Sequence, residues 1–363
     1  MMAWTLLFFG ALLSLLLLPL APALLEWRAK RDARPLKVVR EHDGNIKHFA
    51  LTYGQFVNEH FGALLQALAP GASVTGQLAD GAAYQLIGPQ AGLVFAPVAL
   101  VADASSRMVL GKEALRLADD MLFEKEVYAA AAICGGSHNS FRAILAGGAL
   151  EMGEHCAIAR WAHSDAGISL GSYAKLYGRI SAGTEIGLRQ HSRFGRMHAP
   201  LIRFGAATAP RARVAPALSA LAVPPAILDR TPERWLVAGS LAVPPASFLP
   251  ASLVTQKDLS VGAGSHLGAG IKCNGDLRLE GHLRIDGAVV CSGNMTIGPG
   301  CIIKGPVVCE QTVTIAAGTV IGSPAHPTTV TAPEIRIEEG VLAHGSVWAR
   351  EIGYVAPARA AGA

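Results

Sequence analysis

The chain repeats every six residues from Ile271 to Ile321, and this period constrains its fold more than any other feature. Each repeat opens with two inward positions separated by one outward residue, which is typical of a short strand with one buried face. Glycine often follows two residues later, where it allows the backbone to turn a corner. The inward residues are apolar except for Thr319: Ile271, Cys273, Leu277, Leu279, Leu283, Ile285, Val289, Cys291, Met295, Ile297, Cys301, Ile303, Val307, Cys309, Val313, Ile315, Thr319 and Ile321.

Three such strands and corners make a coil of about 18 residues, and coils of this kind stack into a solenoid. Cys273, Cys291 and Cys309 are spaced by eighteen residues, so they should occupy the same place on successive coils. The sequence therefore predicts an all-β fold, a parallel β-helix. The period is shared by left- and right-handed forms and does not choose between them.

The repeat divides the chain into segments. It predicts one β-helix over 251–356, interrupted after Gly322 by a Pro-rich insertion, and an upstream β-helical block over 106–204 that frays near residue 195. Residues 205–250 are rich in Ala and Pro, which indicates a linker. Residues 28–105 are interpreted as a juxtamembrane α+β or capping region, with a helix over 54–68 and a strand over 91–102. Residues 357–363 are expected to be a disordered tail.

Residues 3–25 carry no charged side chain, and this length suits a helix that crosses a membrane. We expect a transmembrane anchor over 1–27. Basic residues follow the stretch and none precedes it, so the positive-inside rule predicts a single-pass protein of the inner (cytoplasmic) membrane with the bulk of the chain in the cytoplasm. The alternative is a cleaved signal peptide, although its first residues would lack the usual positive charge. The anchor residues are Trp4, Leu6, Leu16, Leu25, Trp27, Arg28, Lys30 and Arg31.

Composition argues against several other classes of protein. The net charge is +4 and no basic stripe with interleaved aromatic residues occurs, which disfavours nucleic-acid binding. No CxxC pair occurs, which disfavours a zinc site, and four cysteines fall on inward positions, where a thiol packs as a small apolar group. We expect no cofactor, no metal and no catalytic residue.

Residues 275–322 resemble the bactofilins, the polymer-forming cytoskeletal proteins of bacteria. The similarity lies in the x-L-x-I-x-G rhythm, the IDG step at 285–287 and the IGPG step at 297–300, and it extends over about 250–350. It implies a right-handed β-helix that assembles end to end, often at the membrane, as a scaffold for envelope or cell-shape proteins. The upstream block, the linker and the apolar N-terminus depart from that family's usual short form.

The competing interpretation is a hexapeptide-repeat acyltransferase, a trimer with a left-handed β-helix of the same period. Such an enzyme uses a loop histidine as its general base. The candidate histidines are His155, His163, His191 and His266, and a solvated outward or loop position explains each of them more simply than a catalytic role.

A solenoid has two ends with unpaired strand edges, which must be covered or will pair with another copy. Residues at the C-terminal coil could form a cap or an end-to-end contact: Val347, Trp348, Ile352 and Tyr354. The sequence thus predicts a membrane-anchored scaffold without catalysis, whose partners are further copies of itself, the membrane and an unidentified envelope protein.

Overall fold

The computed structural model describes residues 2–20, 45–88, 106–205 and 217–358. The chain forms two compact units, Met1–Asn45 and Ile46–Ala363. The second unit holds a β-solenoid of about 13 turns. The structure therefore confirms the predicted β-solenoid fold.

The first unit contains helix α1 (Met2–Leu17) and the short 3-10 helix η1 (Leu18–Leu20). Sixteen helical residues extend about 24 Å, less than the roughly 30 Å of a bilayer's hydrocarbon core. Within the described residues, no helix has both the length and the apolar character that crossing a membrane requires. The expected transmembrane helix is therefore wrong, and so is the single-pass inner-membrane location that depended on it. Trp4, Leu6 and Leu16 belong to α1, whereas Leu25, Trp27, Arg28, Lys30 and Arg31 lie outside the described residues.

The first solenoid block runs from β3 to β13, and most of its coils combine one long strand with one short strand. The long strands bend across a corner by a register irregularity, for example between Phe123 and Glu126. The strands are β3 (Met108–Gly111), β4 (Leu115–Leu117), β5 (Leu122–Ala129), β6 (Ile133–Gly135), β7 (Ser140–Ala146), β8 (Leu150–Met152), β9 (Ala157–Ser164), β10 (Ile168–Leu170), β11 (Lys175–Ala182), β12 (Glu185–Leu188) and β13 (Arg193–Phe204). The block does not fray near residue 195, because β13 continues to Phe204.

The second block runs from β14 to β32, and most of its coils have three short strands. They are β14 (Ser219–Ala220), β15 (Ile227–Arg230), β16 (Arg234–Val237), β17 (Leu241–Val243), β18 (Ser247–Leu249), β19 (Ser252–Thr255), β20 (Leu259–Val261), β21 (His266–Leu267), β22 (Ile271–Cys273), β23 (Leu277–Leu279), β24 (Arg284–Ile285), β25 (Val289–Cys291), β26 (Met295–Ile297), β27 (Ile302–Ile303), β28 (Val307–Cys309), β29 (Thr312–Ile315), β30 (Val320–Ile321), β31 (Thr328–Glu338) and β32 (Val341–Ala356). Strands β14 to β18 thus lie in the range interpreted as linker.

The inward positions read from the six-residue repeat are the buried positions of both blocks. Cys273 pairs in parallel with Cys291, and Cys291 with Cys309, so the eighteen-residue spacing is one turn. One apolar core extends from Ile87 through both blocks to Val355. Small inward residues of the first block, such as Ala162, Ala174 and Ala182, are as deeply buried as the larger ones.

A helix and a two-stranded hairpin precede the first block in the chain, and the helix packs along the block and reaches Trp161 on β9. Helix α3 (His48–Ala67) includes most of the helix predicted over 54–68, and its buried residues are Ala50, Val57, Phe61 and Leu65. Strand β1 (Ser73–Gln77) pairs antiparallel with β2 (Ala83–Ile87), which pairs in parallel with β3. The strand predicted over 91–102 lies outside the described residues.

Candidate functional site

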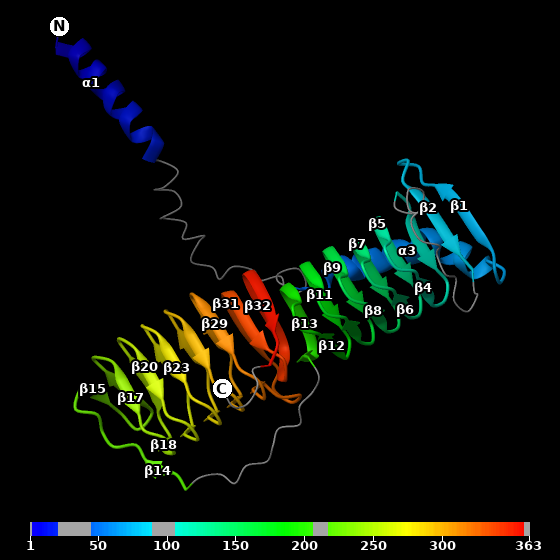
Figure 1. Ribbon diagram of the computed structural model, residues 1–363. Coiled ribbons are helices and arrows are strands. Elements are labelled where there is room, and N and C mark those ends of the chain that lie inside the picture. Colours follow the sequence, from blue (N-terminus) through cyan, green and yellow to red (C-terminus); the bar gives the residue numbers. More distant parts are fainter. Residues whose placement is uncertain (1, 21–44, 89–105, 206–216, 359–363) are drawn as a thin grey trace. The chain divides into compact units, whose positions relative to one another are not determined.

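The two blocks meet at their C-terminal ends. Strand β13, the last of the first block, pairs antiparallel with β32, the last of the second, from Arg193 opposite Tyr354 to Phe204 opposite Val341. Figure 1 shows these two strands, green and red, side by side near the middle of the solenoid, while β14 and β15 lie at its far end. The chain therefore winds toward this junction from both sides.

The connection between the blocks is long enough for this arrangement. Six coil-to-coil steps separate β16 from β32, or about 29 Å at the usual strand spacing. The 14 residues 205–218 could extend to about 46 Å. The second block can therefore begin far from β13 and wind back to it.

The four C-terminal residues expected at a cap or an assembly contact all lie on β32, at this junction. Val347 is fully buried opposite Met197, and Tyr354 lies opposite Arg193. Trp348 and Ile352 point outward and are 42% and 40% exposed. The guanidinium of Arg196 stacks over the Trp348 ring at 4.8 Å. Val347, Trp348 and Tyr354 therefore contact the first block of the same chain, whereas Ile352 pairs with Glu334 of its own block.

Three histidines make side-chain hydrogen bonds across the junction. His191 Nδ1 lies 2.7 Å from the Tyr354 hydroxyl, and His198 Nδ1 lies 2.9 Å from the Ser346 hydroxyl. His344 Nδ1 donates to the Pro200 carbonyl at 2.9 Å. Burial lowers the pKa of His198, as do the nearby charges of Lys47 and Arg196. The sequence did not single out His198 or His344, because the partners lie about 145 residues away along the chain.

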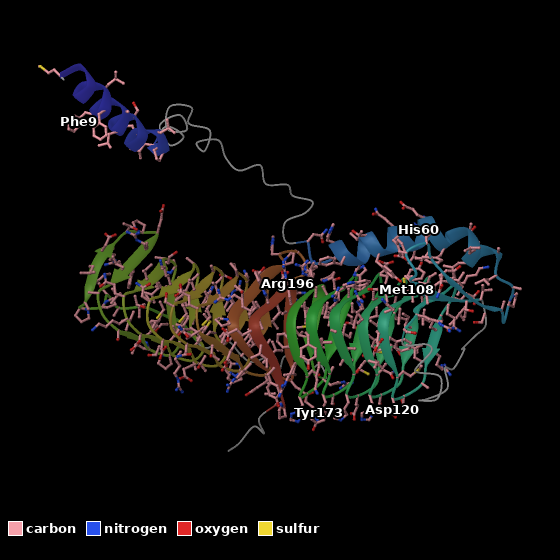
Figure 2. All side chains as sticks on the ribbon, turned by 90° about the horizontal axis from the view of Figure 1, so that it is seen from above. Phe9, His60, Met108, Asp120, Tyr173 and Arg196 are labelled. Carbon is pink, nitrogen blue, oxygen red and sulfur yellow. The ribbon has the colours of Figure 1, made fainter. Side chains whose placement is uncertain are left out.

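A ladder of rings follows one corner of the first block and ends at the junction. His138, His155, Tyr173 and His191 stack at centroid distances of 5.0, 4.6 and 4.7 Å, with nearly parallel planes. Each has a positive φ of 58° to 63°, a conformation that usually selects glycine. Figure 2 shows Tyr173 and Asp120 along this edge of the solenoid.

The ladder has the properties of a structural element more than those of a binding site. Each left-handed residue costs of order 1–2 kcal/mol, and each stacked pair returns about 0.5–1.5 kcal/mol. The ring faces contact one another, so only their edges meet solvent. In-plane nitrogen lone pairs of parallel rings also cannot converge on one ion. No group of three or more His, Cys, Asp or Glu residues suited to a metal occurs in the described part of the chain.

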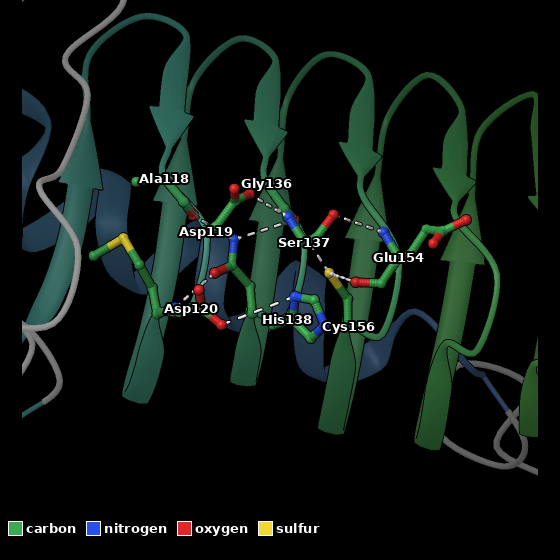
Figure 3. A network of polar contacts seen from close by, with 10 residues as sticks. Ala118, Asp119, Asp120, Gly136, Ser137, His138, Glu154 and Cys156 are labelled. Carbon is green, nitrogen blue, oxygen red and sulfur yellow. Dashed lines mark hydrogen bonds and ion pairs between the residues drawn. The ribbon is translucent and has the colours of Figure 1, made fainter.

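Polar contacts link successive coils beside this corner (Figure 3). Asp119 Oδ1 accepts a hydrogen bond from the Ser137 amide at 2.6 Å, and Ser137 Oγ accepts one from the Glu154 amide at 3.2 Å. The buried Asn139 amide donates to the Ala118 carbonyl, and its oxygen accepts from the Met121 amide. The acidic residues Asp119 and Asp120 therefore belong to the corner of a coil and form no paired-acid site.

The two outer ends of the solenoid differ. At the start of the first block the coil residues Leu115, Leu117, Met121 and Phe123 are all at most 3% exposed. At the start of the second block, β14 pairs only with β18, β15 only with β16 and β17 only with β20, among the described strands. Exposed apolar side chains mark this end: Leu218, Val223 and Leu228 are 42%, 46% and 57% exposed. We call residues 217–243 the open end.

The four histidines considered for an acyltransferase do not form one site. His155 and His191 belong to the ring ladder. His266 Nε2 lies 2.8 Å from an Asp286 oxygen on the next coil. His163 lies between Ser181 Oγ at 2.8 Å and Asp165 Oδ1 at 3.2 Å, which is the composition of a catalytic triad.

Burial decides against catalysis by this last group. His163 is 3% exposed and Ser181 is 1% exposed, so a substrate has no access to the hydroxyl. Burial also lowers the pKa of His163, although Asp165 acts in the opposite direction.

Asp286, the partner of His266, has its ionic partners at the surface of the solenoid. Burial alone would raise its pKa, but hydrogen bonds from Lys304 and His266 and the charge of Arg284 lower it to about 2.

The inward cysteines hold corner carbonyls of the backbone. The Cys273, Cys291 and Cys309 thiols donate to Lys257, Gly275 and Gly293, and Thr255 donates to the Lys257 carbonyl from the same column. All six cysteines of the chain are free thiols. Burial raises the pKa of Cys301 to about 11, which keeps it protonated and unreactive.

Comparisons of the chain with protein-family models, with curated proteins and with solved structures give no match. The fold and the geometry place the chain in the class of β-solenoid proteins, with two blocks joined end to end. This fold is compatible both with a β-helix scaffold and with a hexapeptide-repeat protein.

Proposed function

We propose that this protein is a non-catalytic β-solenoid scaffold that self-associates, and that the open end of its second block is the contact between copies. The observation that carries this proposal is the contrast between the solenoid's ends. The junction strands already pair with each other, and at the start of the first block α3 packs over Leu86, Met108 and Leu110. At the open end β14, β15 and β17 each pair on one side among the described strands, and Leu218, Val223 and Leu228 are exposed.

A second copy of the chain is the occupant that best fits the open end. Strand edges attract other strands, and the junction shows that two solenoid ends of this chain can pair antiparallel over one continuous core. The charges at the open end also suit a contact with itself. Asp229 pairs with Arg234 at 2.8 Å, and Arg230 and Glu233 lie beside them, so neither sign accumulates when two copies meet.

The geometry also predicts the size of the assembly. A contact between two identical ends is isologous and closes after two copies, whereas a filament needs a second, complementary surface. We therefore propose a dimer through the open end in place of the open-ended filament that the resemblance to bactofilins implies. The long faces of the solenoid would remain available to other proteins, including the envelope or cell-shape proteins that the same resemblance suggests.

The proposal is tested by measuring the mass of the purified full-length chain over a range of concentrations. Analytical ultracentrifugation at neutral pH should show a monomer–dimer equilibrium. Leu228→Lys, which adds charge at the most exposed open-end side chain, should shift that equilibrium to monomer by at least tenfold in Kd, about 1.4 kcal/mol. Tyr177→Lys is the matched control, because Tyr177 is 67% exposed on a side face of the first block.

The assembly state and a test of acyl transfer together distinguish the scaffold from the acyltransferase. A trimer that transfers an acyl group from an acyl-CoA to an acceptor would contradict the scaffold and favour the acyltransferase. A monomer at all concentrations would contradict self-association through the open end.

A further inference from the structure

At the junction of the two blocks, β13 and β32 pair along backbone edges that would otherwise have no hydrogen-bonding strand. On both sides the inward residues at the seam are fully buried: Met197 and Phe204 on β13, Val347 and Val355 on β32. The contact is intramolecular and covers the edges that the sequence indicates as an assembly surface. Whatever weakens this junction would therefore release two further solenoid ends.

Imidazole groups are concentrated at this seam. Three of them bridge it, through His191 to Tyr354, His198 to Ser346 and His344 to the Pro200 carbonyl. The ring of His191 is also stacked against Tyr173, so the ladder of the first block continues into the contact. Among side chains, histidine is the one whose charge ordinarily changes between pH 5 and 8.

The charged groups around His198 make a further positive charge on its ring unfavourable. His198 has Lys47, from the turn before α3, and Arg196, from its own strand, as nearby positive groups. Arg196 is in turn next to Arg179 in the neighbouring strand, and burial and the charge of Arg179 lower the pKa of Arg196. Charged groups of both signs lie on the strands around His191 and His344: Lys175, Arg193, Arg203, Arg336, Arg350, Glu334, Glu338 and Glu351. Glu339 accepts from the Gln190 amide, and Glu185 pairs with Arg203.

Protonation also changes what the rings can bond. A neutral imidazole nitrogen can accept a proton from the Tyr354 or Ser346 hydroxyl, whereas both nitrogens of a charged ring are donors. Because the pKa of His198 is lowered in the folded protein, its neutral ring favours the closed junction above the ordinary imidazole pKa of about 6.5. This contribution is lost as the pH falls below that value toward the lowered pKa of the folded state.

We infer that the β13–β32 junction is an acid-sensitive latch, closed at neutral pH, which opens in mild acid and releases the C-terminal edges of both blocks while the chain still links them. This inference goes beyond the proposed dimer and does not depend on it, because the latch lies within one chain and the dimer contact lies at the open end.

Hydrogen exchange on the full-length protein tests the latch directly. Exchange is measured at pH 7.5 and pH 5.0, corrected for the intrinsic rate, with amides of β20, β23 and β26 as internal references. At pH 5.0 the protection of β13 and β32 should fall about tenfold relative to the references, because the stabilising contribution of neutral His198 is lost in mild acid. The triple variant His191→Gln, His198→Gln, His344→Gln keeps polar groups at the seam and should remove this pH dependence.

The matched control replaces three histidines outside the seam and the ring ladder, His60→Gln, His266→Gln and His282→Gln, and it should behave as the original chain does. Equal protection of β13 and β32 at both pH values would overturn the latch. A loss of protection in mild acid that persists in the triple junction variant would also overturn the latch. A loss that β20, β23 and β26 share equally would overturn it as well. None of these results bears on the dimer, whose measurement is made at neutral pH with Leu228→Lys.

Discussion

At the scale of single residues, a side chain's role depends on its place in the eighteen-residue coil. Inward thiols and hydroxyls donate to carbonyls at the corners, as Thr255 and Cys273 do to the Lys257 carbonyl. The six-residue repeat is sufficient to predict that these positions face inward. It does not predict the ring ladder, because the left-handed conformation of His138 or Tyr173 comes from the corner and not from the residue's own preference.

The cysteine column gives a prediction that separates packing from thiol chemistry. Cys291→Ser retains a donor to the Gly275 carbonyl, as Thr255 does in its own coil, so we expect a loss of about 1 kcal/mol or less in unfolding free energy. Cys291→Leu adds volume to a closed core and should cost about 1–3 kcal/mol. Chemical denaturation measures both values. If the two variants were equally destabilised, hydrogen bonding by the thiol would not be its role.

Asp286 gives a prediction about pH. Its pKa is lowered to about 2 by Lys304, His266 and Arg284, so its stabilising contribution is complete above about pH 4 and is lost as the pH falls through 2. Asp286→Asn should destabilise the protein by roughly 1 kcal/mol at pH 7, in view of the partial exposure of the group. The difference between variant and original melting temperatures should shrink between pH 4 and pH 2. A difference that stays constant over this range would contradict the assignment.

At the scale of elements, the sequence predicts strands and their register well, because each coil repeats its side-chain pattern. The antiparallel pairing of β13 with β32 carries no such signature, since any exposed strand edge presents the same backbone groups. The repeat weakens near residue 195, which predicts fraying of the first block. In the structure this segment, with His198 and Pro200, lies at the junction. Apolar character alone also gave a wrong length for the N-terminal helix, which ends at Leu17.

Gly353 tests the junction as an element. A Cβ at this position would overlap the buried ring of Phe194 on β13. Gly353→Ala should therefore destabilise the contact by about 1–3 kcal/mol and accelerate exchange first at β13 and β32. Gly239→Ala is the matched control, because a Cβ there has no neighbour within 4 Å. Unchanged protection at the junction in Gly353→Ala would show that β13 and β32 do not pack as described.

At the scale of the whole solenoid unit, Ile46–Ala363, two blocks wound toward a shared seam leave two outer ends with different properties. Helix α3 packs over the start of the first block, where Leu122 is the exposed apolar side chain of the first coil, and the first coil of the second block exposes Leu218, Val223 and Leu228. The repeat predicts both blocks, whereas the composition of residues 205–250 indicates a linker, and the C-terminal coil is the end that the sequence predicts as a cap or an end-to-end contact. The Ala and Pro content of that segment concealed the short strands β14 to β18.

The most direct test of the account is the mass of the full-length chain at neutral pH as a function of concentration, measured by sedimentation equilibrium for the original protein, Leu228→Lys and Tyr177→Lys. The account predicts a monomer–dimer equilibrium for the original protein and for Tyr177→Lys, and a monomer for Leu228→Lys over the same range. A monomer in all three, or an assembly that Leu228→Lys leaves unchanged, would contradict it.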